Sequence, residues 1–280
     1  MRKFKKWTAA ALSLMLLGSL TACQKDEAEK AGQEGAAKAE DTAKELDPLE
    51  LYTQASEKSR ELQDMEMTID MQMKLMQGEE SLDIGSKMDM KIKGNGTDTM
   101  EYYTDSVTTL MEQEISSTMF YKDGYYYMDT MGQKYKYAYD VQQLMEQVEE
   151  SISASAPEIS GIQNIAAEEK DGTTILTFDV DPSQMNAYVE NALGALGDAS
   201  QTGSVEIQKE SGTCTVGSEG YFTTTDLNMS FSMDIQGTAV DVEATAASSI
   251  SNVGDQVTIS YPEDLNEYTE VDASLVNPEA

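Results

Sequence analysis

Histidine is absent from this sequence, and cysteine occurs only twice. Without histidine, the Ser-His-Asp and Cys-His catalytic arrangements and histidine-based zinc sites are excluded. No phosphate-binding Gly-x-x-x-x-Gly-Lys loop and no Gly-x-Ser-x-Gly nucleophile motif occurs either. Paired carboxylates can support glycosidase chemistry, but with 51 acidic residues any such pair is uninformative. The sequence therefore predicts a protein that is not an enzyme and has no cofactor and no metal.

Basic residues are also few, with 19 Lys and Arg against 51 Asp and Glu, which gives a net charge of −32. Nucleic-acid binding needs clustered Lys and Arg, so this balance argues against a nucleic-acid partner. It also argues against insertion among anionic lipid headgroups. The acidic residues predict a solvated, self-repelling surface. A calcium site has only weak support, because no stretch matches the D-x-[DN]-x-[DN]-G loop.

The chain opens with MRKFKKWTAAALSLMLLGSLTAC, in which a basic start precedes an apolar stretch that is short for a membrane span. This pattern is typical of a secretory signal. Its end, Leu-Thr-Ala-Cys at 20–23, resembles the bacterial lipobox. The resemblance implies that 1–22 is a lipoprotein signal peptide and that Cys23 is acylated, which anchors the protein on the extracytoplasmic face of the cell membrane. The alternative is an ordinary signal peptide with an incidental cysteine.

Residues 23–46 are rich in Ala, Glu, Lys and Gly and have no apolar periodicity, so we expect a disordered acidic tether. The folded domain is expected at 47–270, with 271–280 as a C-terminal tail. After acylation of Cys23, Cys214 is the remaining thiol, so no disulfide can form within the chain. Cys214 alternates with threonines, and we expect it to be a small buried residue.

Three segments have helical periodicity: 47–62, 141–152 and 181–197. The first and third each begin with Asp-Pro, a good N-cap followed by a residue suited to the first helical position. Each segment has an apolar stripe. We therefore expect three amphipathic helices, each able to cover part of a sheet.

The rest of the chain alternates apolar and polar residues. In MEMTIDMQMKLM, at 65–76, every second residue is Met, Ile or Leu, which predicts a strand with one apolar face. The segments 86–92 and 227–235 repeat this pattern, and an Asp-Gly pair at 123–124 predicts a tight hairpin. Further strands are expected at 99–110, 116–122, 125–129, 134–139, 173–180, 204–216, 239–250 and 256–261. The sequence thus predicts an α+β fold, with a large curved antiparallel sheet wrapped around amphipathic helices.

A lipobox, an acidic tether, DPLELYTQASEKSRELQDMEMTIDMQMKL and MFYKDGYYYMDTMGQKYKY together resemble an uncharacterised family of Met-rich Gram-positive lipoproteins. The resemblance covers nearly the whole mature domain. It implies a LolA/LppX-like fold, an unclosed half-barrel with helices on its concave face, and a hydrophobic ligand between sheet and helices. No ligand-contact motif transfers residue by residue. The YxDGxxY…GQKYK-like segment is matched at Tyr121, Asp123, Gly124, Tyr127, Gly132, Gln133, Lys134, Tyr135 and Lys136.

The 18 methionines allow three interpretations. Thioethers select Cu(I), but three separate strands share the pattern, whereas a metal site concentrates its ligands. Alternatively, the methionines form a filled core, or they form a pliable lining for an apolar ligand. The sequence does not separate these last two. The candidates for the inner, ligand-lining face are Met67, Met71, Met73, Met88, Met90, Met229, Phe231 and Met233.

Seven of the fourteen tyrosines lie between Tyr121 and Tyr139. Tyr135, Tyr137 and Tyr139 share one strand face, which is compatible with a stacking platform for sugar rings. Half-exposed tyrosine is also an ordinary strand residue, and we favour this structural interpretation.

The sequence thus predicts a membrane-anchored extracytoplasmic lipoprotein that binds or carries a hydrophobic, lipid-like ligand. The alternative is a structural or protein-interaction module of the cell envelope with a filled core. No protein partner is identifiable from the sequence.

Overall fold

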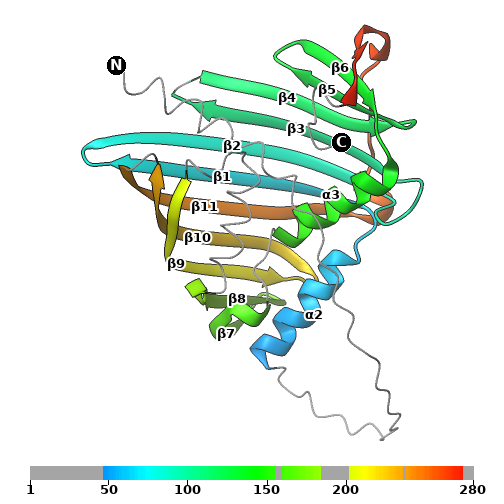
Figure 1. Cartoon of the computed structure of the whole chain (residues 1–280). Coiled ribbons are helices and arrows are strands. Elements are labelled where there is room, and N and C mark those ends of the chain that lie inside the picture. The colour runs from blue at the N-terminus through cyan, green and yellow to red at the C-terminus, as the bar shows by residue number, and fades with distance from the viewer. Residues whose placement is uncertain (1–46, 112, 155–158, 184–201, 236–237, 274–280) are drawn as a thin grey trace, which may run out of the picture.

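The computed structural model describes residues 47–111, 113–154, 159–183, 202–235 and 238–273 (Figure 1). Two helices and twelve strands lie in these ranges, joined in part by 3-10 turns at 159–161, 254–256 and 265–267. The helices are α2 (Pro48–Arg60) and α3 (Val141–Ala154). The strands are β1 (Met65–Gln77), β2 (Glu80–Lys93), β3 (Glu101–Leu110), β4 (Gln113–Lys122), β5 (Tyr125–Thr130), β6 (Gln133–Ala138), β7 (Ile162–Lys170), β8 (Thr173–Val180), β9 (Thr202–Val216), β10 (Phe222–Ile235), β11 (Thr238–Val253) and β12 (Thr269–Glu270).

All the described strands form one sheet in the order β12-β6-β5-β4-β3-β2-β1-β11-β10-β9-β8-β7. Neighbours are antiparallel except β12 and β6, which run parallel. The β1–β11 pair joins the β1–β6 half to the β7–β11 half. The two edges, β12 and β7, do not pair with each other, so the sheet is unclosed. Figure 1 shows a curved sheet with α2 and α3 on the same side. The predicted α+β half-barrel with a helix-covered face is confirmed.

The face that carries Met65 and Met67 contacts the helices and is called the inner face; the opposite one is the outer face. Three apolar clusters occupy the inner face. The α3 cluster comprises Met65, Met67, Met90, Ile92, Met100, Tyr102, Tyr121, Tyr126, Tyr137, Leu144 and Val148. The α2 cluster comprises Tyr52, Ala55, Leu176, Phe178, Val180, Cys214, Val216 and Phe222. The strand-end cluster comprises Leu75, Leu82, Ile84, Leu110, Ile207, Phe231, Met233, Val240 and Val242.

The start of α2 follows the predicted capping. The Asp47 carboxylate accepts a 2.9 Å hydrogen bond from the Leu49 N–H, and Pro48 is the first helical residue. At α3, the Asp140 carboxylate accepts the Gln142 N–H at 2.7 Å. The helix predicted at 181–197 lies outside the described residues except for its first three. There, the Asp181 carboxylate accepts the Ser183 N–H at 2.9 Å, as an N-cap does.

The strand predicted at 256–261 is wrong. This segment crosses the outer face instead of pairing at a sheet edge. The Thr258 carbonyl accepts a hydrogen bond from Lys91 of β2, and Tyr261 packs against the outer-face aromatic residues. Tyr261 lies 5.4 Å from Phe120, ring centroid to centroid. Strand β7 was not predicted, because most of its side chains are exposed and it lacks a clear apolar alternation. No helix among the described residues is long and apolar enough to cross a membrane.

Candidate functional site

All eight residues predicted to line the inner face lie on that face of the sheet, as the strand register shows. Met67 pairs with Met90, Met73 pairs with Ile84 and Ala244, and Ala244 pairs in turn with Met229. Phe231 and Met233 continue the same face along β10, opposite Val242 and Val240. The structure therefore brings these side chains onto one surface, although a ligand contact for any of them stays a prediction.

The eight residues do not form a single packed group. Met67 and Met90 are buried in the α3 cluster. Phe231 and Met233 are buried in the strand-end cluster, with Met73 and Met229 packed against it. Met71 and Met88 lie between these two groups, and Met71 is 39% exposed.

The exposure of Met71 follows from the size of its neighbours. Ser86 is opposite Met71 on β2, and Thr108 follows on β3. On the other side, Ala246 of β11 is its partner. These small side chains cannot cover a thioether, so the middle of the inner face keeps a partly open apolar strip. Such a strip suits an irregular apolar partner, because methionine is unbranched and polarizable.

The sequence reasoning missed Glu210, a carboxyl group on the inner face. Glu210 of β9 lies between Val180 of β8 and Met229 of β10 and is only 2% exposed. No described residue donates a hydrogen bond to its Oε2 atom. Burial raises the pKa of this carboxyl group to about 7, because an apolar environment disfavours the charged form. A second apolar phase within β9 is the signal that reveals Glu210.

Cys214 is a buried residue of the α2 cluster, as predicted. Its thiol donates a hydrogen bond to the Thr225 hydroxyl at 3.6 Å. Burial raises the pKa of the thiol to about 12, so the reactive thiolate is scarce at neutral pH. Among the described residues, no group of three or more His, Cys, Asp or Glu side chains is arranged to hold a metal ion.

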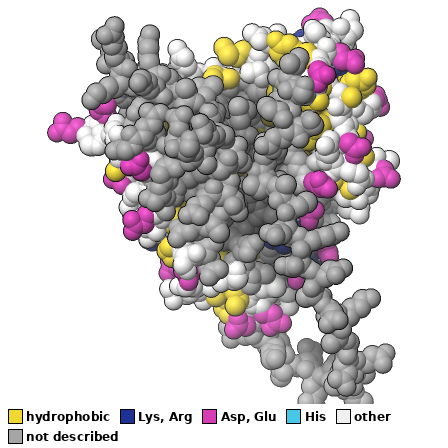
Figure 2. Space-filling model, viewed as in Figure 1, with side chains coloured by type: hydrophobic (Ala, Val, Ile, Leu, Met, Phe, Trp, Pro, Cys, Tyr) yellow, Lys and Arg dark blue, Asp and Glu magenta, His cyan; other side chains and the backbone are white. Residues whose placement is uncertain are grey.

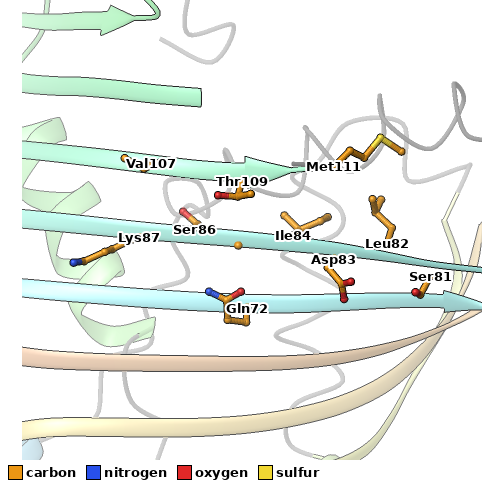
Figure 3. Close-up of a pocket in the computed structure, with 11 residues that line it drawn as sticks. Gln72, Ser81, Leu82, Asp83, Ile84, Ser86, Lys87, Val107, Thr109 and Met111 are labelled. Carbon is orange, nitrogen blue, oxygen red and sulfur yellow. The ribbon is translucent and has the colours of Figure 1, made fainter. Parts of the chain in front are cut away.

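A cavity of about 620 Å³ lies at Gly85 in the middle of β2 (Figure 3). Because Gly85 has no side chain, the surface is hollowed there, and the Gln72 amide of β1 lies beside it. Gln72, Asp83, Lys87 and the neighbouring β3 residues belong to the outer face. This cavity is therefore not the predicted ligand site between sheet and helices.

The tyrosine-rich segment alternates between the two faces. Tyr126 and Tyr137 are buried in the α3 cluster, which supports their structural interpretation, whereas Tyr135 is exposed. On the outer face, Phe120 and Tyr127 stack at 4.6 Å between ring centroids.

The lysines of the same segment bind the segment Val257–Glu270, called the C-terminal return, to the outer face. Lys134 forms ion pairs with Asp264 and with Glu267, and Lys136 forms an ion pair with Glu270. The hydrogen bond from Lys134 is the main cause that lowers the pKa of Asp264. This part of the GQKYK-like motif therefore has a structural role.

A family model matches residues 47–270. The chain belongs to DUF6612, a family of unknown function. The expected membership of an uncharacterised family is thereby confirmed. No curated protein matches the chain.

Solved structures that match this chain weakly include LprF from Mycobacterium bovis, with 12% identity, a TM-score of 0.37 and coverage of 77% of this chain and 96% of that one. A LolA superfamily protein from Nitrosomonas europaea has 11% identity, a TM-score of 0.21 and coverage of 79% and 97%. The fold itself is established by the strand order and register described above.

Proposed function

We propose that this protein is a membrane-anchored extracytoplasmic lipoprotein that binds or carries a hydrophobic, lipid-like ligand on the inner face of its sheet. The observation that carries the proposal is the partly open thioether strip around Met71, which lies between two buried apolar clusters. Ligand sites are mostly apolar concavities with few polar groups. The inner face has this composition, and Glu210 is its one buried carboxyl group among the described residues.

The anchor belongs to the same proposal. Cys23 would be acylated, 1–22 removed, and 23–46 would act as a tether that holds the domain at 47–270 away from the bilayer, with 271–280 as a tail. Of these segments, the structure describes only part of 47–270 and residues 271–273. The proposed role is binding without catalysis.

The test is native mass spectrometry on residues 24–280, which retain every residue that the structure describes, purified without detergent. We expect a stoichiometric apolar adduct that is lost on organic extraction. The Met71→Glu variant places a charge in the strip and should lose the adduct. Met131→Glu, at a turn residue that is 72% exposed, is the matched control and should keep it.

The second candidate is an envelope module with a filled core. It is favoured by the burial of Met67, Met90 and Met233 within the packed clusters. A bare mass, unchanged after incubation with membrane lipids and with Cu(I), would support this candidate and would refute both the carrier and the copper interpretations.

A further inference from the structure

Among the described residues, one buried carboxyl group interrupts the apolar inner face. Glu210 is almost fully buried, and its Oε2 atom has no hydrogen-bond partner among the described residues. None of the ion pairs formed by the described residues includes it. Burying a carboxylate without a partner is costly, and a leucine would pack at this position without that cost. The packing of the sheet therefore does not explain why residue 210 carries a carboxyl group.

Among the described residues, none that faces Glu210 forms an ion pair with it. On the neighbouring strands it faces Val180 and Met229, which do not titrate. Helix α2 contributes Tyr52. Burial is the main cause that raises the pKa of Tyr52, and the nearby Glu210 charge raises it further, whereas Arg60 lowers it. On its own strand, the nearest titratable group on the inner face is the buried Cys214 thiol.

The position of Glu210 suits an amphiphile. Met229, its partner on β10, packs against the strand-end cluster, and Phe231 and Met233 extend that apolar row along the same strand. On the other side, the Phe178 ring of the α2 cluster lies over Gly212, two residues along β9. Glu210 is thus a polar point beside Met229, and Ala244 and Met73 continue the inner face from Met229 toward the exposed Met71.

We propose that Glu210 is the polar anchor of the ligand site and binds the ammonium group of an amphiphile whose apolar chain lies along Met229 and Met73 toward the partly open strip at Met71. The inference rests on the proposed function and names its ligand class. An ammonium group supplies both the missing positive charge and the missing hydrogen-bond donors. The strongly acidic chain attracts cations and repels anionic amphiphiles. Figure 2 shows acidic side chains along the visible part of the described surface, with few Lys and Arg.

Binding should therefore depend on pH through Glu210. With a pKa near 7, the carboxyl group is mostly neutral at pH 6 and mostly ionised at pH 8. The raised pKa values keep Cys214 and Tyr52 protonated over this range. The affinity for an ammonium amphiphile should rise about tenfold from pH 6 to pH 8, in proportion to the ionised fraction of one group.

The experiment measures binding of dodecylammonium, dodecanol and dodecanoate, each below its micelle concentration, to residues 24–280 by calorimetry at pH 6 and pH 8. The isosteric Glu210→Gln variant should bind dodecylammonium more weakly at pH 8 and lose the pH dependence. Glu243→Gln, at an exposed β11 residue, is the control and should behave like the wild type. Circular dichroism checks that Glu210→Gln is folded.

The outcomes separate this inference from the proposed function. If Glu210→Gln binds dodecylammonium as the wild type does, or if dodecanol or dodecanoate binds as tightly as dodecylammonium at pH 8, the ammonium anchor is refuted while the hydrophobic-ligand function stands. If none of the three probes binds, the proposed function fails, and the inference fails with it.

Discussion

The ring of Phe178 occupies the space above Gly212, its antiparallel partner on the next strand. A Cβ atom at Gly212 would lie 2.5 Å from the ring Cζ atom and 2.8 Å from Cδ2 of Leu227. Phe178 is buried against Tyr52 of α2, with ring centroids 5.4 Å apart, so the ring has nowhere to move. The absence of a side chain at Gly212 is therefore what lets α2 pack on this half of the sheet.

Gly212→Ala should destabilise the protein by about 1–3 kcal/mol, as overpacking of a closed core does. The measurement is urea unfolding of residues 24–280, followed by circular dichroism. Gly85→Ala is the matched control, because its Cβ atom would meet only the end of the Gln72 side chain, at 3.0 Å. That change should alter the free energy of unfolding by less than about 1 kcal/mol. Equal stability of the two variants would contradict the packing described here.

Glu210→Gln should stabilise the ligand-free protein at pH 8. The folded-state pKa, about 7, is above the ordinary value of 4.5, so the folded protein prefers the neutral carboxyl group. The contribution of Glu210 to stability is thus full below pH 4.5 and is lost as the pH rises from there to about 7. The gap in unfolding free energy between variant and wild type should open over this window and reach about 3 kcal/mol.

Urea unfolding at a series of pH values between 4.5 and 8 measures this gap. The difference between variant and wild type cancels the other carboxylates, and Glu243→Gln should show no gap. A gap that is independent of pH would mean that Glu210 is ionised throughout, and the unpaired, buried carboxyl group would then be an incorrect description.

Most strands follow from the alternation of the sequence, and β9 shows where alternation fails. Ile207 and Cys214 both face inward, yet one has an odd and the other an even number. Ser230 pairs with Lys209 while Phe231 pairs with Ile207, so Gln208 is an extra residue that shifts the phase. An alternation extended from Ile207 places Glu210 outside. The bulge places it inside, and the two conflicting apolar phases are the signal in the sequence.

The strand predicted at 256–261 is wrong for a different reason. Val257, Ile259 and Tyr261 alternate as a strand does, but alternation shows only that one side of the segment is covered, not what covers it. Here, the outer-face aromatic residues Phe120, Tyr127 and Tyr268 cover Tyr261. The lysines that hold the return of the chain come from β6, more than a hundred residues earlier, so local sequence does not reveal the arrangement.

Lys134→Met should loosen the C-terminal return without unfolding the sheet. The variant keeps the apolar part of the side chain but removes the ion pairs to Asp264 and Glu267. Hydrogen exchange at Val257–Glu270 should become faster, while exchange in β1 stays unchanged. Lys74→Met, at an exposed residue of β1, is the control. Unchanged exchange at Val257–Glu270 would show that the aromatic contacts alone hold the segment.

The sequence predicts which residues lie on the inner face, but not which of them remain open to a ligand. Alternation places Met71 and Met88 on the apolar side of their strands, and the register confirms it. Which of these methionines stays open depends on the partners, such as Ser86 and Ala246, that the sheet sets beside them. Those pairings bring together residues up to 175 positions apart in the sequence, and no local pattern specifies them.

The lipid anchor has a direct test. In a Gram-positive host grown with radioactive palmitate, the wild-type chain should carry the label and fractionate with membranes, because two acyl chains on Cys23 suffice for stable attachment. Cys23→Ala should lose both properties. Cys214→Ala is the matched control and should keep the label, since this thiol is buried in the folded domain. An unlabelled wild-type chain in the soluble fraction would indicate an ordinary signal peptide. A labelled Cys23→Ala variant would place the acyl chains on another residue.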